Sequence, residues 1–247
     1  MLVCGVLSTA YAADYTITEI NMGGPSSEAR SINDSGAVTG WGINAGNKIK
    51  GFLYKSGTLT ELGHLNPLVQ VSQGYALNKF DQAVGTTYDA DIHTAGVLWE
   101  NDTTTHLGFL PGGTYAYAYG INDAKEVVGF SATTVPSFTI HTFLWKDGVM
   151  TDLGTLGGLR SMAWAINNKG QVVGEAEEVN APMIPGPNAN DQNLMRKPTI
   201  WDHGTATCLC VGVEEMEGGI AYAIAEISRI DLTGIGFSSK LTCCYCR

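Results

Sequence analysis

The nine residues Ile166–Gly174 read INNKGQVVG, and this phrase occurs four times along the chain. The other copies are INDSGAVTG at 32–40, LNKFDQAVG at 77–85 and INDAKEVVG at 121–129. Their asparagines stand at positions 33, 78, 122 and 167, so successive copies are 45, 44 and 45 residues apart. A fixed period of this length indicates a protein of repeated structural units that must stack on one another to bury a core.

Each phrase predicts a β-hairpin. In the copy at 166–174 an apolar run ends at Ile166, the turn is Asn167–Gly170, and a second apolar run follows. Asn and Asp adopt left-handed backbone geometry and bond their own backbone, and Gly adopts positive φ without strain. Calcium loops use the same residue types, but the phrase lacks their spaced carboxylates and their later bidentate Glu. The second copy also has Phe80 inside the turn. We therefore expect structural turns rather than calcium sites.

A second hairpin fills the rest of the period, and Thr142–Gly154 is its clearest copy, with Asp147-Gly148 as the turn. The equivalent runs carry an aromatic residue at positions 54, 99, 145 and 201. The last of these steps is lengthened by an insertion loop at 180–196, whose prolines exclude a central strand. Two hairpins make four short strands in about 45 residues, which is the size of one propeller blade.

These patterns predict an all-β protein, a β-propeller of five four-stranded blades, as a single domain over residues 13–247. Thr16–Ile20 resembles Val149–Leu153, so the chain enters midway through a repeat. Gly236–Leu241 is the candidate for the strand beside Thr16–Ile20, which would make the last blade shared by the two termini and close the ring. The alternative is an open β-solenoid of stacked repeats.

Composition and charge indicate which partners and which cellular location the chain can have. It has 247 residues, of which 44% are hydrophobic and 15% charged, and a formal net charge of −10. This charge disfavours nucleic acid and anionic membrane surfaces as partners. Residues 1–12 end in Ala10-Tyr11-Ala12, a cleavage pattern that predicts a signal peptide, although the basic start is missing and an apolar first strand is the alternative. We expect a secreted protein, extracellular or periplasmic, with no membrane span and a monomeric state.

The run His141–Gly158, followed by Ala165–Gly174, closely resembles the HAF-type extracellular repeat of bacteria. Thr142 stands where that family's His-Ala-Phe triplet has Ala. The resemblance extends from about Tyr15 to Phe237 and is strongest in the third and fourth copies. It implies a secreted or surface protein of repeated β units, and it carries over no catalytic residue. Lectin-like five-bladed propellers have similar repeat lengths, which is an analogy of fold alone.

Aromatic residues are the candidates for ligand binding. Trp99, Trp145 and Trp201 recur once per repeat and could stack on sugar faces, but packing between blades is the alternative that we favour. Tyr115, Tyr117 and Tyr119 alternate on one face of a strand, with Ala116 and Ala118 on the other face. This stripe is the best candidate for an exposed aromatic surface, and packing on the next blade is the equal alternative.

The cysteines leave three alternatives open: a disulfide between two groups of cysteines, no bond, or a zinc site of unusual spacing. Two lie at i, i+2 and three lie within the last five residues. After removal of residues 1–12 five remain, so they cannot all pair with one another. The residues are Cys208, Cys210, Cys243, Cys244 and Cys246.

No sequence motif points to catalysis or to a cofactor. There is no H-E-x-x-H, G-x-S-x-G, P-loop or G-x-G-x-x-G pattern in the chain. We therefore expect a non-catalytic binding or interaction module, with carbohydrate or a cell-surface protein as its partner and with no cofactor and no metal. The alternatives are a structural surface protein without a small ligand and a hydrolase whose site is assembled from loops.

Overall fold

The computed structural model describes residues 17–133, 139–179, 183–185, 192–194, 196–209, 219–222, 224 and 244–246. This part of the chain is all-β: it forms strands and turns and no helix, and sixteen of its strands lie in three sheets. It holds no helix of a length and hydrophobicity that would cross a membrane. The expected signal peptide, Cys210, Cys243 and the segment 236–241 lie outside the described residues.

Two of the sheets are antiparallel, with four strands each in sequence order, and each sheet is one repeat. Repeat 1 consists of β1 (Gly23–Ile32), β2 (Val38–Asn44), β3 (Ile49–Lys55) and β4 (Thr58–Glu61). Repeat 2 consists of β5 (Ser72–Leu77), β6 (Ala83–Tyr88), β7 (Thr94–Glu100) and β8 (Thr103–His106).

The eight-stranded sheet contains two more repeats of the same kind, joined by a single parallel pair, Ile140 with Arg160. Repeat 3 consists of β9 (Ala116–Ile121), β10 (Val127–Ala132), β11 (Ile140–Lys146) and β12 (Val149–Gly154). Repeat 4 consists of β13 (Gly157–Ile166), β14 (Val172–Glu178), β17 (Arg196–Asp202) and β18 (Thr205–Cys208). The prediction of four strands per period is confirmed for all four repeats.

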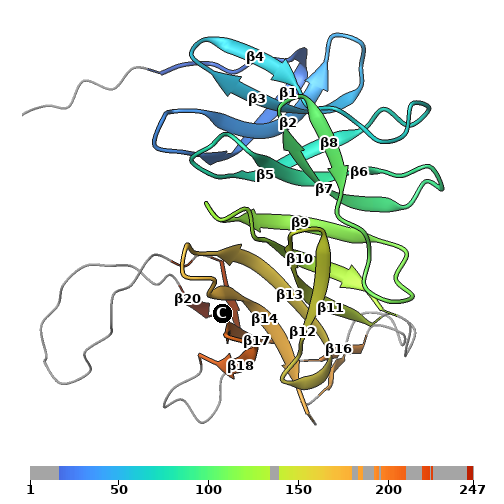
Figure 1. Cartoon of the computed structure of the whole chain (residues 1–247), viewed down its shortest axis with the longest axis vertical. Helices are drawn as coiled ribbons and strands as arrows, with labels where there is room; N and C mark the ends of the chain where they lie inside the picture. Colours follow the sequence, from blue (N-terminus) through green and yellow to red (C-terminus); the bar gives the residue numbers. More distant parts are fainter. Residues whose placement is uncertain are drawn as a thin grey trace, which may run out of the picture.

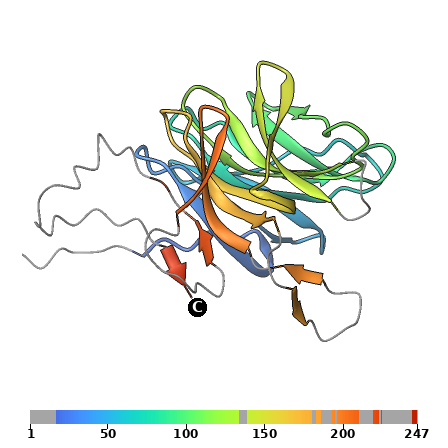
Figure 2. The ribbon, with the colours of Figure 1, turned by 90° about the horizontal axis from the view of Figure 1, so that it is seen from below.

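The insertion and the C-terminal part contribute two short ribbons. Within 180–196, β15 (Met183–Pro185) pairs with β16 (Gln192–Leu194), and Figure 2 shows this ribbon standing away from the sheets. β19 (Gly219–Ala221) pairs with β20 (Cys244–Cys246). Figure 1 shows the four repeats following one another in an arc, with β20 beside repeat 4. The described residues 17–20 form no strand, although we expected one at Thr16–Ile20.

The turns explain the repeated phrase. We call β1–β2 and its equivalents the first hairpins, and β3–β4 and its equivalents the second hairpins. In every first hairpin the third residue after the Asn has positive φ, between 61° and 78°. That residue is Gly in two copies, Gly36 and Gly170, and Asp81 or Lys125 in the others. The left-handed geometry therefore belongs to the turn itself and does not require Gly.

The glycine that ends each phrase is required by a β-bulge. The register of each first strand skips one residue, which is Arg30, Tyr75, Tyr119 or Trp164. In repeat 3, a Cβ placed on Gly129 would lie 1.8 Å from the Tyr117 carbonyl oxygen. In the other repeats the equivalent distance is 1.9 or 2.0 Å. Only a residue without a side chain leaves room for the bulged backbone.

The core lies between neighbouring repeats. Three clusters of buried apolar residues occupy the three junctions, and each contains one tryptophan. Trp99 packs with Leu62 and Ala37 of repeat 1. Stacking of this kind is what a repeat of about 45 residues needs, because one sheet alone buries too little apolar surface.

Candidate functional site

The bulged residues of successive repeats converge. Tyr75, Tyr119 and Trp164 each stand three residues before the turn Asn, and Tyr222 follows β19. The ring centroids are 5.0 Å apart for Tyr75 and Tyr119, and 4.8 Å apart for Tyr119 and Trp164. Trp164 and Tyr222 are 5.8 Å apart. We call these four residues the aromatic row.

Two of the three expected tyrosines take part in this cluster. Tyr119 belongs to the row, and Tyr117 stacks on it at 6.0 Å and on Phe130 at 5.0 Å. Tyr115 is half-buried just before β9. Ala116 and Ala118 face the other way and are fully buried against repeat 2, as the alternation predicted.

Sequence reasoning missed Tyr75, Trp164 and Tyr222. The signal was available, because the residue three before each turn Asn is Arg30, Tyr75, Tyr119 and Trp164 in the four copies. The alternation of Tyr115, Tyr117 and Tyr119 was read along one strand only. It did not reveal the bulge, which in every repeat turns the residue three before the turn Asn toward the same residue of the next repeat.

The aromatic row has polar groups beside it. The Tyr75 hydroxyl donates to Gln73 Oε1 at 3.0 Å, and Arg30 forms an exposed ion pair with Glu28 at 3.0 Å. Burial raises the pKa of Tyr75 and of Tyr119. Both hydroxyls are protonated at neutral pH, as tyrosine hydroxyls ordinarily are. Tyr75, Tyr119 and Trp164 are half-buried, and Tyr222 is 53% exposed. The row therefore combines apolar ring faces with hydrogen-bonding groups.

The expected tryptophans occupy a different place. Trp99, Trp145 and Trp201 are 5%, 7% and 1% exposed, and each lies in one of the core clusters. The Trp99 indole donates to the Gly63 carbonyl oxygen at 2.9 Å. Rings buried to this degree offer no face to a sugar, which fits the packing alternative.

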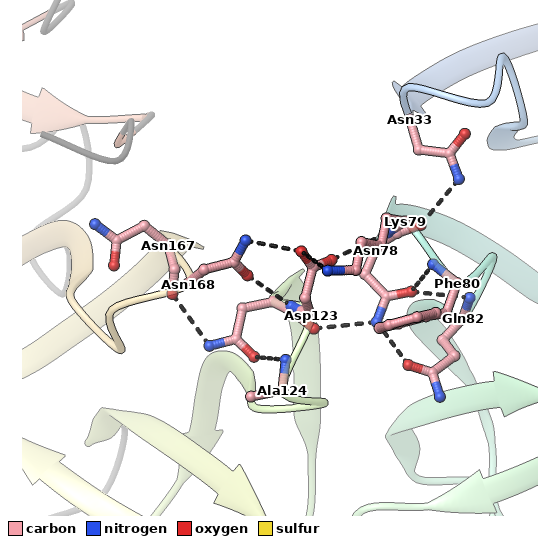
Figure 3. A network of polar contacts seen from close by, with 10 residues as sticks. Asn33, Asn78, Lys79, Phe80, Gln82, Asp123, Ala124, Asn167 and Asn168 are labelled. Atoms are coloured by element: carbon pink, nitrogen blue, oxygen red, sulfur yellow. Dashed lines mark hydrogen bonds and ion pairs between the residues drawn. The ribbon is translucent and has the colours of Figure 1, made fainter.

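The turn asparagines link the repeats to one another (Figure 3). Asn33 Nδ2 donates to the Asn78 carbonyl oxygen at 2.9 Å, and Asn78 Nδ2 donates to that of Asn122 at 3.0 Å. Asn122 continues to Asn167 at 3.1 Å. Each Oδ1 accepts backbone N–H groups of its own turn, as in Asn122, which accepts from Ala124 and from Glu126. These oxygens are thus occupied within the turn, as the structural interpretation requires.

A second line of contacts runs beside the first. The Asp123 amide donates to Asn168 Oδ1 at 2.8 Å, and the Lys79 amide donates to Asp123 Oδ1 at 3.2 Å. Burial would raise the pKa of Asp123, but hydrogen bonds from Lys79 and Asn168 outweigh it and hold the pKa below its usual range. The carboxylate therefore stays ionised between two repeats.

The turns surround a hollow of about 290 Å³. Its apolar lining comes from the residue before each turn Asn and from the corresponding residue after β19. These residues are Ile32, Leu77, Ile121, Ile166 and Ile224. Five equivalent positions of the sequence thus meet around one space.

Two buried carboxylates lie side by side on β14, outside the aromatic row. Glu175 and Glu177 of β14 are 2% and 1% exposed, and burial raises the pKa of both. Glu175 is paired with Arg196 at 2.5 Å, and Glu177 accepts the Leu159 amide at 3.1 Å. Neither reaches solvent, so neither can meet a substrate in this structure.

A loop group, Asp89, Asp91 and His93, has ligand atoms within 4.8 Å of one another. Asp89 Oδ1 accepts the backbone amides of Asp91 and His93, at 3.0 and 2.8 Å. Its other oxygen lies 3.4 Å from His93 Nδ1. The group is explained as a loop held by its own carboxylate.

The comparisons with known proteins supply no function. No protein-family model matches the chain, and no curated protein matches it. A functional conclusion therefore has to come from the arrangement of the residues themselves.

Proposed function

We propose that the chain is a five-bladed β-propeller that acts as an exported, non-catalytic binding module, with the aromatic row as a saccharide-binding surface. The observation that carries the binding function is the row itself. Equivalent residues of successive repeats place aromatic rings 4.8 to 5.8 Å apart, and these rings are partly open to solvent. The resemblance to HAF-type extracellular repeats supports export.

The shared hollow supports a ring over a solenoid. In an open stack, the first and fifth repeats would be separated by the three between them. Here Ile32 and Ile224 line the same space as the equivalent residues of the middle repeats. β19 also contacts β14 and β17, just as β13 contacts β10 and β11. We infer that β19 begins a fifth blade around a common axis.

A hydrogen bond from a serine side chain supports the proposal that both termini share that blade. Ser161 Oγ donates to the Gly154 carbonyl oxygen at 2.7 Å, and thereby to the end of the preceding repeat's last strand. Ser27 Oγ donates in the same way to the Ile20 carbonyl oxygen at 2.7 Å. This correspondence supports residues 17–20 as the end of the last strand of a shared blade.

The test of closure is a chain that ends at Ile235. If residues after 235 complete a shared blade, their loss opens the ring, exposes sheet edges and destabilises every repeat. Thermal unfolding and sedimentation would show a large loss of stability or association. A small loss, with the shortened protein still monomeric, would rule out the shared blade.

The saccharide function follows from the chemistry of the row. Pyranose rings present apolar C–H faces that stack on aromatic rings, and their hydroxyls need polar partners at the edge. Here Tyr75 and Tyr119 stack on one another and leave part of each ring open to solvent, while Arg30, Glu28 and Gln73 offer hydrogen bonds.

The binding test is a glycan array followed by calorimetry on the best glycan. Trp164→Ala and Tyr119→Ala should each weaken binding at least about tenfold, the loss expected for one stacked ring. Phe80→Ala is the matched control, because Phe80 is a 60% exposed aromatic residue away from the row. Glycan binding that survives both row variants, or an array with no hit, would refute the saccharide assignment.

A further inference from the structure

The junction of repeats 1 and 2 contains a groove that the aromatic row does not use. It has a volume of about 740 Å³, with Leu53 and Leu62 of repeat 1 and Trp99 of repeat 2 in its lining. The corresponding hollow between repeats 3 and 4 has about 330 Å³ and is lined by the equivalents Leu144, Leu153 and Trp201. The same architecture therefore forms a much larger space at the first junction.

Phe80 borders this groove, and the Lys79 ammonium lies over its ring, 4.9 Å from the ring centroid. Phe80 is 60% exposed, and the other copies have Ser35, Ala124 and Lys169 at its position. Its backbone amide donates to Asn78 Oδ1 at 3.0 Å. Ser35, Ala124 and Lys169 make the same backbone bond to their own Asn, so the turn does not need the phenyl ring.

The groove also has an excess of negative charge. Four carboxylates line it together with one cation, Lys55. Two of the carboxylates are paired, Asp81 with Lys55 and Glu100 with Lys125. Among the described residues neither Glu61 nor Asp102 forms an ion pair, and Glu61 accepts an amide hydrogen bond from Asn44 at 2.7 Å. The lining of the corresponding hollow contains one carboxylate, Glu126, which is paired with Lys146, and two basic residues, Lys169 and His203.

We propose that this groove binds a short basic peptide segment of a partner protein, in which Lys or Arg residues flank an apolar or aromatic side chain. The apolar side chain would lie against Phe80, Leu53 and Leu62. The cations would meet Glu61 on β4 and Asp102 in the turn before β8, which border the same groove. A volume of about 740 Å³ is within the range of sites that enclose a few side chains. The charge and the exposed ring together select this chemistry over a neutral or acidic segment.

The experiment uses fluorescein-labelled hexapeptides with Leu, Phe or Trp between Lys and Arg residues, and the same peptides with Glu in place of each cation. Fluorescence anisotropy with the full chain should show saturable binding of the basic set alone. Phe80→Ser, which installs the residue of repeat 1 at this position, should weaken binding about tenfold, as should Glu61→Gln combined with Asp102→Asn. Thermal unfolding would show that these exposed changes leave the fold intact.

The matched control is Lys169→Ser in the corresponding hollow, which should leave binding unchanged. Equal binding of the basic and acidic sets, or equal binding by the wild type and Phe80→Ser, would overturn the proposal. The second outcome would mean that the peptides only follow the negative charge of the protein. Absence of saturable binding up to about 1 mM would also overturn it. Glycan binding at the aromatic row is measured separately, so either proposal can fail without the other.

Discussion

The turns of the first and second hairpins use similar residue types but differ in what they contact. Both turn through left-handed geometry, at Gly170 in a first hairpin and at Asp147-Gly148 in a second hairpin. A Cβ added to Gly57, Gly148 or Gly204 of the second hairpins would meet nothing within 4 Å. In the first hairpins, the Asn side chain instead reaches the backbone of the next repeat. Local turn chemistry is thus common to both, and it is the turn Asn of the first hairpins that bonds to the turn of the next repeat.

The two kinds of hairpin therefore contribute differently to the stability of the molecule. A substitution in the turn of a second hairpin should affect only that hairpin, because a side chain added there meets open space. A first hairpin belongs to its own repeat and to the next one, so a change there acts on two junctions. Four substitutions test this difference.

Replacing Gly129 by Ala should produce the largest loss. The new methyl group would lie 1.8 Å from a backbone oxygen, so the bulge cannot form without displacing β9. We expect a loss of about 3 kcal/mol or more in the free energy of unfolding. Gly148→Ala in a second hairpin has space but a φ of 85°, so it should cost only about 1 kcal/mol. Urea unfolding of both variants would measure the difference, and equal losses would contradict the comparison.

Replacing Asn122 by Ala should cost about 2 kcal/mol. The change removes the bond to the Asn167 carbonyl oxygen at 3.1 Å and leaves the Ala124 and Glu126 amides without their acceptor. Asp147→Asn in a second hairpin keeps a residue that tolerates left-handed geometry, and it should stay within about 0.5 kcal/mol of the wild type. If Asn122→Ala were as mild as this control, the link between repeats would contribute nothing.

Replacing Lys125 by Gln should have a small effect. Lys125 of repeat 3 reaches Glu100 of repeat 2 at 2.7 Å, but both side chains are about a third or more exposed. We expect a loss below about 1 kcal/mol that shrinks as salt is raised, because solvent screens exposed pairs. Denaturant unfolding at low and high ionic strength would show the trend. A loss independent of salt would indicate that packing of the lysine stem matters more than charge.

Replacing Tyr119 by Phe should leave stability at neutral pH nearly unchanged and alter its alkaline limb. Burial raises the pKa of Tyr119 in the folded protein above its ordinary value of about 10. The folded state therefore holds this proton more tightly, and stability falls as pH rises above about 10. The variant lacks this titration, so its stability should fall less steeply. Melting temperatures of the variant and the wild type from pH 8 to 11 would test this prediction. An equal fall in both proteins would contradict a raised pKa of the half-buried Tyr119.

Much of the fold could be predicted from the sequence because its turns carry local signals. The Asn phrase and Asp147-Gly148 specify hairpins through backbone geometry, which depends on a few neighbouring residues. The bulge could not be read in this way, since Gly129 is required by a clash with Tyr117, twelve residues away. Of the aromatic row, only Tyr119 was among the predicted residues, for the same reason. Tyr117 and Tyr119 alternate visibly, whereas Tyr75 and Trp164 meet Tyr119 only through the bulge.

The bulge has a consequence for how the protein can change. Because the bulged residue is skipped by the pairing ladder, the sheet makes no demand on its side chain beyond the space around the axis. Arg30, Tyr75, Tyr119 and Trp164 already differ in charge, size and hydrogen bonding on one unchanging backbone. The frame is held by Gly and Asn at fixed places, while these positions remain open to exchange. One residue per repeat can therefore be exchanged without any change to the backbone that carries it.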